Sequence, residues 1–309
     1  MPIEHAAVRV VHKPWGASDL RPWSSIDATN DAIGELWFER VDKSASNPAL
    51  LLKLLFTNEP LSIQVHPNDT FARAMDLPNG KSEAWYILSA KPGAKIGIGL
   101  KHRIAPQELR ASIRDGSIVD LVQWRPVAKG DVVFIPAGTI HALGGGIVLA
   151  EIQQNSDATF RLFDYGRGRD LHEDQAVAAA DARPLSSADG ARRLTSERTV
   201  LVASQHFVFE KVDLRASSSW ALLAQPETWI LVLDGHAAIG LTPVSVGDAV
   251  FACGGRTSIE VGVNGLTALV AYPAAAPVAS LLQALGESSA APVPRTAVAE
   301  LISLFEART

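Results

Sequence analysis

Residues 130–141 have the sequence GDVVFIPAGTIH, and this stretch decides the fold that we expect for the chain. A Gly-Asp turn precedes four apolar residues, which read as a short buried strand. A tight Pro-Ala-Gly turn follows, and His141 lies directly beyond it. A lone histidine after a turn is more often structural than a metal ligand, so its meaning depends on the polar residues elsewhere in the chain.

A second stretch, residues 61–67 with the sequence LSIQVHP, alternates apolar and polar residues. This alternation predicts a strand with Ser62, Gln64 and His66 on one face. An edge strand with its polar face in water is one interpretation. Polar residues inside a barrel instead need partners, and a metal ion can provide them. With Glu83 and His141, the chain offers one amide, two imidazoles and one carboxylate, a set that can hold a divalent metal with one position open.

Five segments, in this order, resemble the short bacterial form of the type I mannose-6-phosphate isomerases. They are residues 13–16 (KPWG), 64–69 (QVHPND), 81–86 (KSEAWY), 135–143 (IPAGTIHAL) and 151–164 (EIQQNSDATFRLFD). The spacing Gly-x5-Pro-x-Gly-x2-His in residues 130–141 also resembles the second signature motif of the cupin superfamily. The resemblance covers the first two-thirds of the chain, and no motif was recognised after about residue 200.

The resemblance implies a mainly β protein made of two cupin-like β-barrel or jelly-roll domains with a small helical insert. We expect a metal-binding catalytic domain at residues 1–198, with the insert at about residues 103–124. A second cupin-like domain at residues 199–309 would lack metal ligands and end in a short helix around Val298 and Phe305. The second domain is suggested by residues 246–251 (VGDAVF), which echo residues 129–134 (KGDVVF) without a following histidine.

Apolar runs bounded by turn residues predict the individual elements. The expected strands are residues 51–56, 61–66, 84–88, 96–100, 132–135, 147–152 and 159–163, then 207–212, 228–233, 247–251, 257–261 and 266–271. Helical spacing predicts helices in the insert, within residues 170–182, and a short one at residues 278–285.

The resemblance implies that Gln64, His66, Glu83 and His141 bind one zinc ion per chain. It also implies a zinc-dependent aldose–ketose isomerase that interconverts mannose 6-phosphate and fructose 6-phosphate through an enediol(ate) intermediate. Neutral imidazoles and a carboxylate suit zinc well. A bound zinc ion would polarise the oxygen on which negative charge develops.

Three further residues are candidates for catalysis. Arg161 follows the Gln-Asn-Ser-Asp run, where the family has an essential arginine, and a permanently charged guanidinium would stabilise the enediolate. Glu151, Lys81 and a metal-bound water are candidates for the proton transfers, and the sequence does not rank them.

Two residues are candidates for binding the phosphate group of the substrate. Ser62 lies two residues before Gln64 on the same strand face, and the family uses a hydroxyl at this place. Arg167 follows Asp164-Tyr165-Gly166 and resembles the Asp-x-Gly-Arg ending of the short form. A surface arginine without a ligand is the alternative interpretation for Arg167.

Composition limits the partners and the compartment. The 309 residues carry a formal net charge of −5, which argues against a nucleic-acid surface. No run of 18 apolar residues predicts a membrane span, and the N-terminal residues lack the pattern of a secretory signal. The single cysteine, Cys253, excludes an intrachain disulfide and has apolar neighbours that predict a buried thiol. We therefore expect a cytoplasmic monomer whose partner is a small-molecule sugar phosphate.

Two other functions remain open. One is another metal-dependent cupin enzyme, such as a dioxygenase or a different sugar-phosphate isomerase. Gln64 as a ligand and the Gln-Asn-Ser-Asp run argue against a dioxygenase, whose sites usually present more histidines. The other is a non-catalytic sugar-phosphate-binding protein, which the retention of all four ligand types and of Arg161 disfavours.

Overall fold

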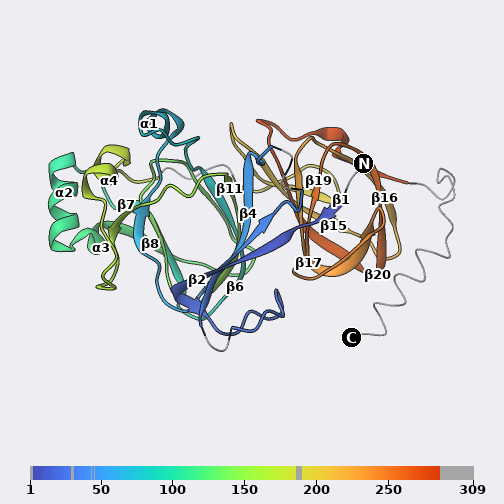
Figure 1. Cartoon of the computed structure of the whole chain (residues 1–309), viewed down its shortest axis with the longest axis horizontal. Helices are drawn as coiled ribbons and strands as arrows, with labels where there is room; N and C mark the ends of the chain where they lie inside the picture. The colour runs from blue at the N-terminus through green and yellow to red at the C-terminus, as the bar shows by residue number, and fades with distance from the viewer. Residues whose placement is uncertain (1–2, 29–30, 43, 45, 186–189, 286–309) are drawn as a thin grey trace.

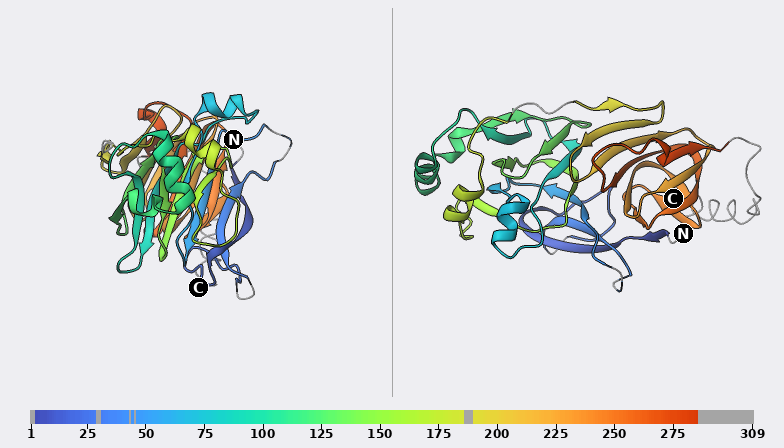
Figure 2. Two further views of the ribbon diagram at one scale, coloured as in Figure 1. Left: turned by 90° about the vertical axis from the view of Figure 1, so that its left-hand side faces the viewer. Right: turned by 90° about the horizontal axis from the view of Figure 1, so that it is seen from above.

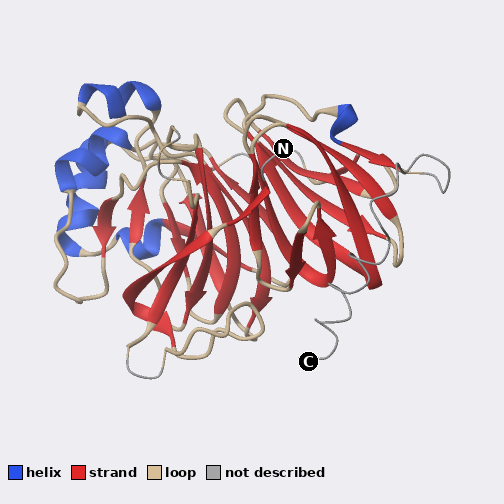
Figure 3. Ribbon diagram, turned by 45° about the vertical axis from the view of Figure 1, so that its right-hand side comes forward, coloured by secondary structure: helices blue, strands red, loops and turns tan. Residues whose placement is uncertain are grey.

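Two β units lie side by side along the long axis of the molecule, and helices gather at one end (Figure 1). The computed structural model describes residues 3–285 apart from 29–30, 43, 45 and 186–189. Strands dominate both units (Figure 3), which confirms the predicted mainly β class.

The first unit is built from two antiparallel sheets that enclose a common interior. The six-stranded sheet has the order β2 (Ala7–Ala17), β3 (Ile33–Glu39), β4 (Leu50–Thr57), β11 (Ile147–Gln154), β6 (Glu83–Ala90) and β9 (Val132–Ile135). The five-stranded sheet has the order β12 (Phe160–Phe163), β5 (Ile63–Val65), β10 (His141–Leu143), β7 (Lys95–Leu100) and β8 (Val122–Pro126).

Strand β4 shows why the six-stranded sheet is apolar on both faces. All eight of its residues, LLLKLLFT, are buried. Successive side chains point to opposite faces of a sheet. Leu55 belongs to the apolar cluster inside the first unit, whereas Leu52 and Leu54 belong to a cluster shared with the second unit. The strand therefore separates the interior of one barrel from the contact with the other.

The helices of the first unit lie at the end far from the second unit (Figure 1). They are α1 (Asp69–Ala74), α2 (Pro106–Asp115), α3 (Ile118–Leu121) and α4 (Glu173–Ala179). Helices α2 and α3 confirm the predicted insert. Pro106 starts α2, and Gly116 ends it with a positive φ of 81°, a conformation that glycine adopts without strain. Within the described residues, no helix is long and apolar enough to cross a membrane.

The second unit is a ten-stranded antiparallel sheet. Its main path is β1 (Ile3–His5), β19 (Ala249–Ala252), β17 (Thr228–Ile239), β20 (Gly255–Tyr272), β15 (Val208–Leu214), β14 (Arg198–Ala203) and β13 (Arg192–Arg193). Strands β16 (Ser219–Ala224), β18 (Thr242–Ser245) and β21 (Leu282–Ala284) pair beside this path, and the short helix η1 (Ala279–Leu281) precedes β21.

Strand β1 belongs to the second unit although it opens the described chain. It pairs antiparallel with β19, with Ile3 opposite Ala252 and His5 opposite Val250. The chain then crosses to the first unit as β2, as the view from above shows (Figure 2). The division of the chain at residue 198 stays a prediction, since β1 connects the two units.

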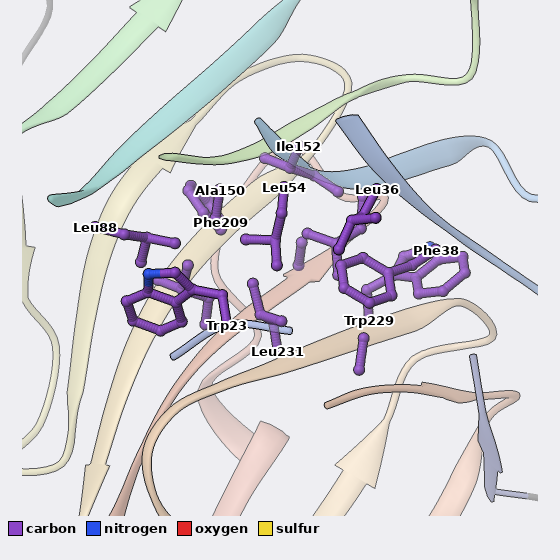
Figure 4. Close-up of a cluster of buried hydrophobic side chains, with 14 of the residues drawn as sticks. Trp23, Leu36, Phe38, Leu54, Leu88, Ala150, Ile152, Phe209, Trp229 and Leu231 are labelled. Carbon is purple, nitrogen blue, oxygen red and sulfur yellow. The ribbon is translucent and has the colours of Figure 1, made fainter. Parts of the chain in front are cut away.

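One hydrophobic core joins the two units (Figure 4). The first unit contributes Leu36, Phe38, Leu54, Leu88, Ala150 and Ile152, and the second contributes Phe209, Trp229 and Leu231. These side chains cover the outer face of the six-stranded sheet. Since burial of apolar area is the main stabilising term in folding, the units stabilise each other.

Three sequence predictions for the second unit are wrong. Residues 257–261 and 266–271 form one strand, β20, in which Gly265 has a φ of 83° and the pairing register with β17 shifts nearby. Asn264 and Gly265 form an irregularity within this strand and do not end it with a turn. Residues 278–285 contain a three-residue helix and β21 instead of one helix. Cys253 is exposed. The predicted C-terminal helix lies outside the described residues.

Candidate metal centre

His66, Glu83 and His141 come together inside the first unit. His66 follows β5, Glu83 begins β6 and His141 begins β10. Their ligand atoms all lie within 4.8 Å of one another. Nε2 of His66 is 3.3 Å from Oε2 of Glu83, and Nε2 of His141 is 3.3 Å from Oε1. All three side chains are buried, so two imidazoles converge on one carboxylate away from bulk water.

The hydrogen bonds of both histidines fix which ring nitrogen faces the centre. Nδ1 of His66 lies 2.8 Å from the carbonyl oxygen of Ala158, and Nδ1 of His141 lies 2.9 Å from that of Thr139. A carbonyl oxygen only accepts, so each Nδ1 must carry the proton. Each Nε2 then presents a lone pair toward Glu83, the arrangement found in metal-binding histidines.

Gln64 and Ser62 extend the centre along β5. The side-chain amide nitrogen of Gln64 is 3.3 Å from Nε2 of His141, and the Ser62 hydroxyl donates to Oε1 of Gln64 at 3.1 Å. The oxygen and nitrogen of an amide are interchangeable in shape, and the hydrogen-bond network assigns them. In the exchanged orientation, Oε1 of Gln64 faces His141 and the amide nitrogen donates to the Ser62 hydroxyl.

Lys81 is a buried lysine whose ammonium group lies within the centre. Its Nζ atom is 2.7 Å from Oε2 of Glu83 and 2.9 Å from Nε2 of His66. Burial opposes the charge on Lys81, but the carboxylates of Glu83 and Glu151 outweigh burial and raise its pKa. Lys81 is not a solvated loop lysine, since only 4% of the residue is exposed.

Burial and charge also set the protonation of the three converging residues. Burial lowers the pKa of His66 to about 3, with a further contribution from the Lys81 ammonium. Burial likewise lowers the pKa of His141. Burial alone would raise the pKa of Glu83, but Lys81 and His66 hold it well below its usual range. Neutral imidazoles beside an ionised carboxylate are the forms that bind metals.

Backbone contacts of the turn before His141 hold the centre together. The N–H of Gly138 donates to the carbonyl of His66 at 2.8 Å, and the N–H of Ala137 donates to the Ser82 hydroxyl at 3.2 Å. Gly138 has a φ of 88°, which a residue with a side chain adopts only with strain. The Pro-Ala-Gly turn therefore connects the segments that carry His66, Glu83 and His141.

Glu151 is buried in the same unit, on β11. Its Oε2 accepts a hydrogen bond from the Trp85 indole at 2.9 Å. The Trp85 ring meets the His141 ring edge-on, with centroids 5.7 Å apart. Burial and the charge of Glu83 raise the pKa of Glu151, against the effect of Lys81 and Lys53. Glu151 is thus a buried carboxylate beside the centre, close enough to Glu83 for their charges to interact.

Sequence reasoning missed two charged residues next to Glu151. Lys53 lies 3.4 Å from Oε1 of Glu151 and 3.6 Å from Oε2 of Glu35. Both residues are charges between apolar neighbours in largely buried strands, LLLKLLFT for Lys53 and IGELWFE for Glu35. A charge in the middle of a buried strand could have identified them, because such a charge needs a buried partner.

Arg161 lies across β5 from the centre. It is opposite Gln64 in the β12–β5 pairing, so the two side chains share a face. Its Nε donates to the carbonyl of Asp170 at 3.0 Å, and its backbone N–H is bound by His172. Arg161 is partly exposed, which places a fixed positive charge on the same face as Gln64 at the border between the site and solvent.

Arg167 makes its contacts with Asp164. Its guanidinium donates to the Asp164 carboxylate at 3.0 Å and to the Asp164 carbonyl at 3.2 Å, and Arg169 binds the same carboxylate. Arg167 also lies over the Tyr165 ring at 5.5 Å. The structure thus brings Gln64 and Lys81 into contact with the converging residues and Ser62 into contact with Gln64, and places Arg167 in a separate cluster of charges.

The donor set fits a divalent metal ion. Two imidazoles and one carboxylate form a catalytic zinc set in other proteins, with a further position for another ligand. Both carboxylate oxygens of Glu83 are buried; the Lys81 ammonium lies 2.7 Å from Oε2, whereas Oε1 has no hydrogen-bond donor among the described residues. Burying an anionic oxygen that has no hydrogen-bond donor costs free energy unless a cation pairs with it. His66, Glu83 and His141 can therefore hold a metal ion.

The curated relatives that match this sequence carry the name mannose-6-phosphate isomerase. No family model matches the chain. A mannose-6-phosphate isomerase from Streptococcus mutans is 36% identical over 266 residues, which cover 74% of this chain and 83% of that protein. A mannose-6-phosphate isomerase from Bacillus subtilis is 33% identical over 193 residues, 59% of this chain and 60% of that protein.

Solved structures agree with these relatives. The crystal structure of a Bacillus subtilis mannose 6-phosphate isomerase has a TM-score of 0.76 at 25% identity, covering 87% of this chain and 98% of that one. A mutant phosphomannose isomerase from Salmonella typhimurium has a TM-score of 0.68 at 15% identity, covering 87% of this chain and 99% of that one. At this identity the likeness supports the fold alone. The predicted fold class and family resemblance are confirmed.

Proposed function

The chain belongs to the mannose-6-phosphate isomerase family, and we propose that it interconverts mannose 6-phosphate and fructose 6-phosphate with the help of a bound zinc ion. The observation that carries this proposal is the convergence of His66 and His141 on Glu83, with both Nδ1 atoms bound to backbone carbonyls. The names of the relatives give the substrate, and the donor set supports the metal.

Zinc would be held by His66, Glu83 and His141, with Gln64 as the fourth protein ligand. When bound, zinc supplies a Lewis acid that stabilises negative charge on a substrate oxygen. Gln64 joins the set if its amide takes the exchanged orientation, with Oε1 toward His141. Ser62 supports that orientation, because its hydroxyl can accept a hydrogen bond from the amide nitrogen as readily as it can donate one.

Glu151 is the proposed group for moving the proton between C1 and C2 of the open-chain sugar. A carboxylate that is not a metal ligand remains free to accept and return a proton. The Trp85 indole holds one of its oxygens at 2.9 Å, so the carboxylate has a set orientation. Lys81 would supply positive charge close to the enediolate as it forms.

Arg161 is the proposed cation that stabilises the enediolate, since its side chain shares a face with Gln64 and stays charged. Ser62 and Arg167 are proposed to bind the phosphate group. For Arg167 this requires that the guanidinium keep one prong on Asp164 and turn the other to the phosphate, a geometry that its planar fork of donors allows.

We also propose that the enzyme acts as a monomer in the cytoplasm. A single cysteine fits a reducing compartment, where disulfides are rare. The formal net charge of −5 is unfavourable for binding nucleic acid, which leaves the sugar phosphate as the expected partner.

A coupled isomerase assay on metal-stripped and zinc-restored protein tests the proposed function. We expect stripped protein to be inactive with mannose 6-phosphate and to recover on addition of zinc. His141→Gln should contain less zinc and lose activity, whereas His236→Gln, in the second unit, should keep both. Undiminished turnover after complete removal of metal would refute the role of the metal. An inactive, fully zinc-loaded protein would refute the proposed substrate.

A further inference from the structure

Three charged side chains form a buried line across neighbouring strands of the six-stranded sheet. Glu35 lies on β3, Lys53 on β4 and Glu151 on β11. Lys53 is directly opposite Glu151 in the β4–β11 pairing. Nζ of Lys53 is 3.4 Å from Oε1 of Glu151 and 3.6 Å from Oε2 of Glu35. Exposure of the Lys53 and Glu151 side chains is 4% each, so water does not separate these charges.

Each end of this line is held by an indole. Trp85 donates to the second oxygen of Glu151 at 2.9 Å, and Trp37 donates to Oε2 of Glu35 at 2.6 Å. The ammonium of Lys53 also lies over the Trp37 ring, 4.2 Å from its centroid. Lys53 is thus fixed by Glu35 and Trp37 on one side, and presents its charge to Glu151 on the other.

From this geometry we propose that Lys53 is a positioning residue for catalysis, which acts by holding the Glu151 carboxylate in one orientation. This inference rests on the proposed function, in which Glu151 moves the proton. Trp85 alone would leave the carboxylate free to turn about one hydrogen bond. With Lys53 on Oε1 and Trp85 on Oε2, both oxygens are fixed.

The cost of burying Lys53 supports a role beyond packing. The other residues of β4 are apolar except Thr57, and an apolar side chain at position 53 could fill the same space. Buried ion pairs contribute little to stability when compared with apolar residues of similar volume. Glu35 then acts as the counter-charge that holds Lys53 in place beside Glu151.

A double-mutant cycle of Lys53→Met and Glu151→Gln tests the proposal. Lys53→Met should lower kcat by about 10²-fold, the scale for a small misplacement of a catalytic group. KM for mannose 6-phosphate and zinc content should stay close to the wild-type values. In the Glu151→Gln background, Lys53→Met should cause little further loss, because its effect passes through Glu151.

Conservative variants and a matched control distinguish this role from general destabilisation. Lys53→Arg should recover part of the lost kcat, and Glu35→Gln should lower kcat less than Lys53→Met. Arg198 forms a buried ion pair with Glu210 in the second unit, at 2.8 Å. Arg198→Met, assayed where circular dichroism shows it folded, should weaken the fold and leave kcat unchanged.

Two results would overturn the proposal. One is an equal loss of kcat from Lys53→Met with and without Glu151. The other is a rise in KM alone, which would place Lys53 in substrate binding. If Lys53→Met does not fold, the cycle is run with Lys53→Arg and Glu35→Gln against Glu151→Gln, and additive losses would again refute it. An inactive but zinc-loaded wild-type protein would count against the proposed function instead.

Discussion

The ammonium nitrogen of Lys81 lies 2.9 Å from Nε2 of His66, so it uses the lone pair that a metal ion would also need. Metal binding therefore has to displace this contact. We expect Lys81→Met to bind zinc more tightly than wild type, by about tenfold or more, because two like charges no longer approach each other in a buried site. Competition with a chromogenic chelator measures the dissociation constant.

The control for Lys81→Met is Lys129→Met, which removes an exposed lysine in the turn before β9 and should leave zinc affinity unchanged. An unchanged or weaker zinc affinity in Lys81→Met would contradict the competition between lysine and metal.

Arg161→Ala separates catalysis from binding. If Arg161 stabilises charge that develops only in the transition state, kcat should fall by about 10²–10³-fold, the scale for losing one preorganised donor. KM should change little and zinc content should stay at the wild-type level. Arg161→Lys should recover only part of the lost kcat, because a lysine ammonium lacks the planar set of paired donors of a guanidinium. Steady-state kinetics with metal analysis measures all three.

A large rise in KM with unchanged kcat would place Arg161 on the phosphate group instead. The matching comparison is Arg167→Ala, for which we expect the opposite pattern: a higher KM for mannose 6-phosphate and a small change in kcat.

Glu227 predicts a pH dependence of stability at the contact between the units. Its carboxylate accepts the N–H groups of Ala49 at 2.7 Å and Leu50 at 2.8 Å, at the start of β4. Burial raises the pKa of Glu227 above its ordinary value. The folded state therefore holds this proton more tightly than the unfolded state, and the stabilisation is full at acid pH and lost as pH rises through the raised pKa.

The measurement compares wild type with Glu227→Gln in urea unfolding between about pH 4 and pH 7. The stability of wild type relative to the variant should decrease as pH rises. A difference that is constant, or that grows with pH, would show that the carboxyl group is not protonated more readily in the fold.

Arg198→Met should destabilise the second unit strongly. Arg198 and Glu210 are both buried, and Tyr272 donates a further hydrogen bond to Glu210 at 2.5 Å. Removing the arginine leaves a buried carboxylate without its cation, which costs about 3–5 kcal/mol. Urea unfolding should show this decrease in the free energy of unfolding, and the double variant Arg198→Met/Glu210→Leu should regain part of the lost stability. A loss below about 1 kcal/mol, the range of surface pairs, would contradict the prediction.

The sequence predicted most of the first unit because its strands have strong local signals. Alternation in residues 61–66 placed Ser62, Gln64 and His66 on one face, and the structure connects Ser62 to Gln64 and His66 to Glu83. Helix α2 was predicted because apolar spacing, a proline at its start and Gly116 at its end agree. The catalytic roles assigned to these residues stay predictions.

Long-range pairing could not be predicted from local patterns. Nothing in residues 3–5 indicates that β1 would pair with β19, because alternation gives a strand's faces and not its partner. Lys53 was missed for the same reason. Its proposed role depends on lying between Glu35 and Glu151, and only the register of three strands distant in sequence brings those charges together. In β20, two separate strands were predicted at residues 257–261 and 266–271, although the pairing with β17 continues from one to the other.

The pairing of β1 with β19 also orders the events of synthesis. Residues 3–5 emerge early from the ribosome, but their partner, residues 249–252, is translated much later. At translation rates of about 5–20 residues per second, the wait is roughly 10–50 seconds. During that interval β1 has no strand partner, whereas every strand of the first unit, the last of which ends at Phe163, is translated before β19. The pairing of β1 with β19 is therefore a late step of folding on the ribosome, because it requires a strand that is translated after all strands of the first unit.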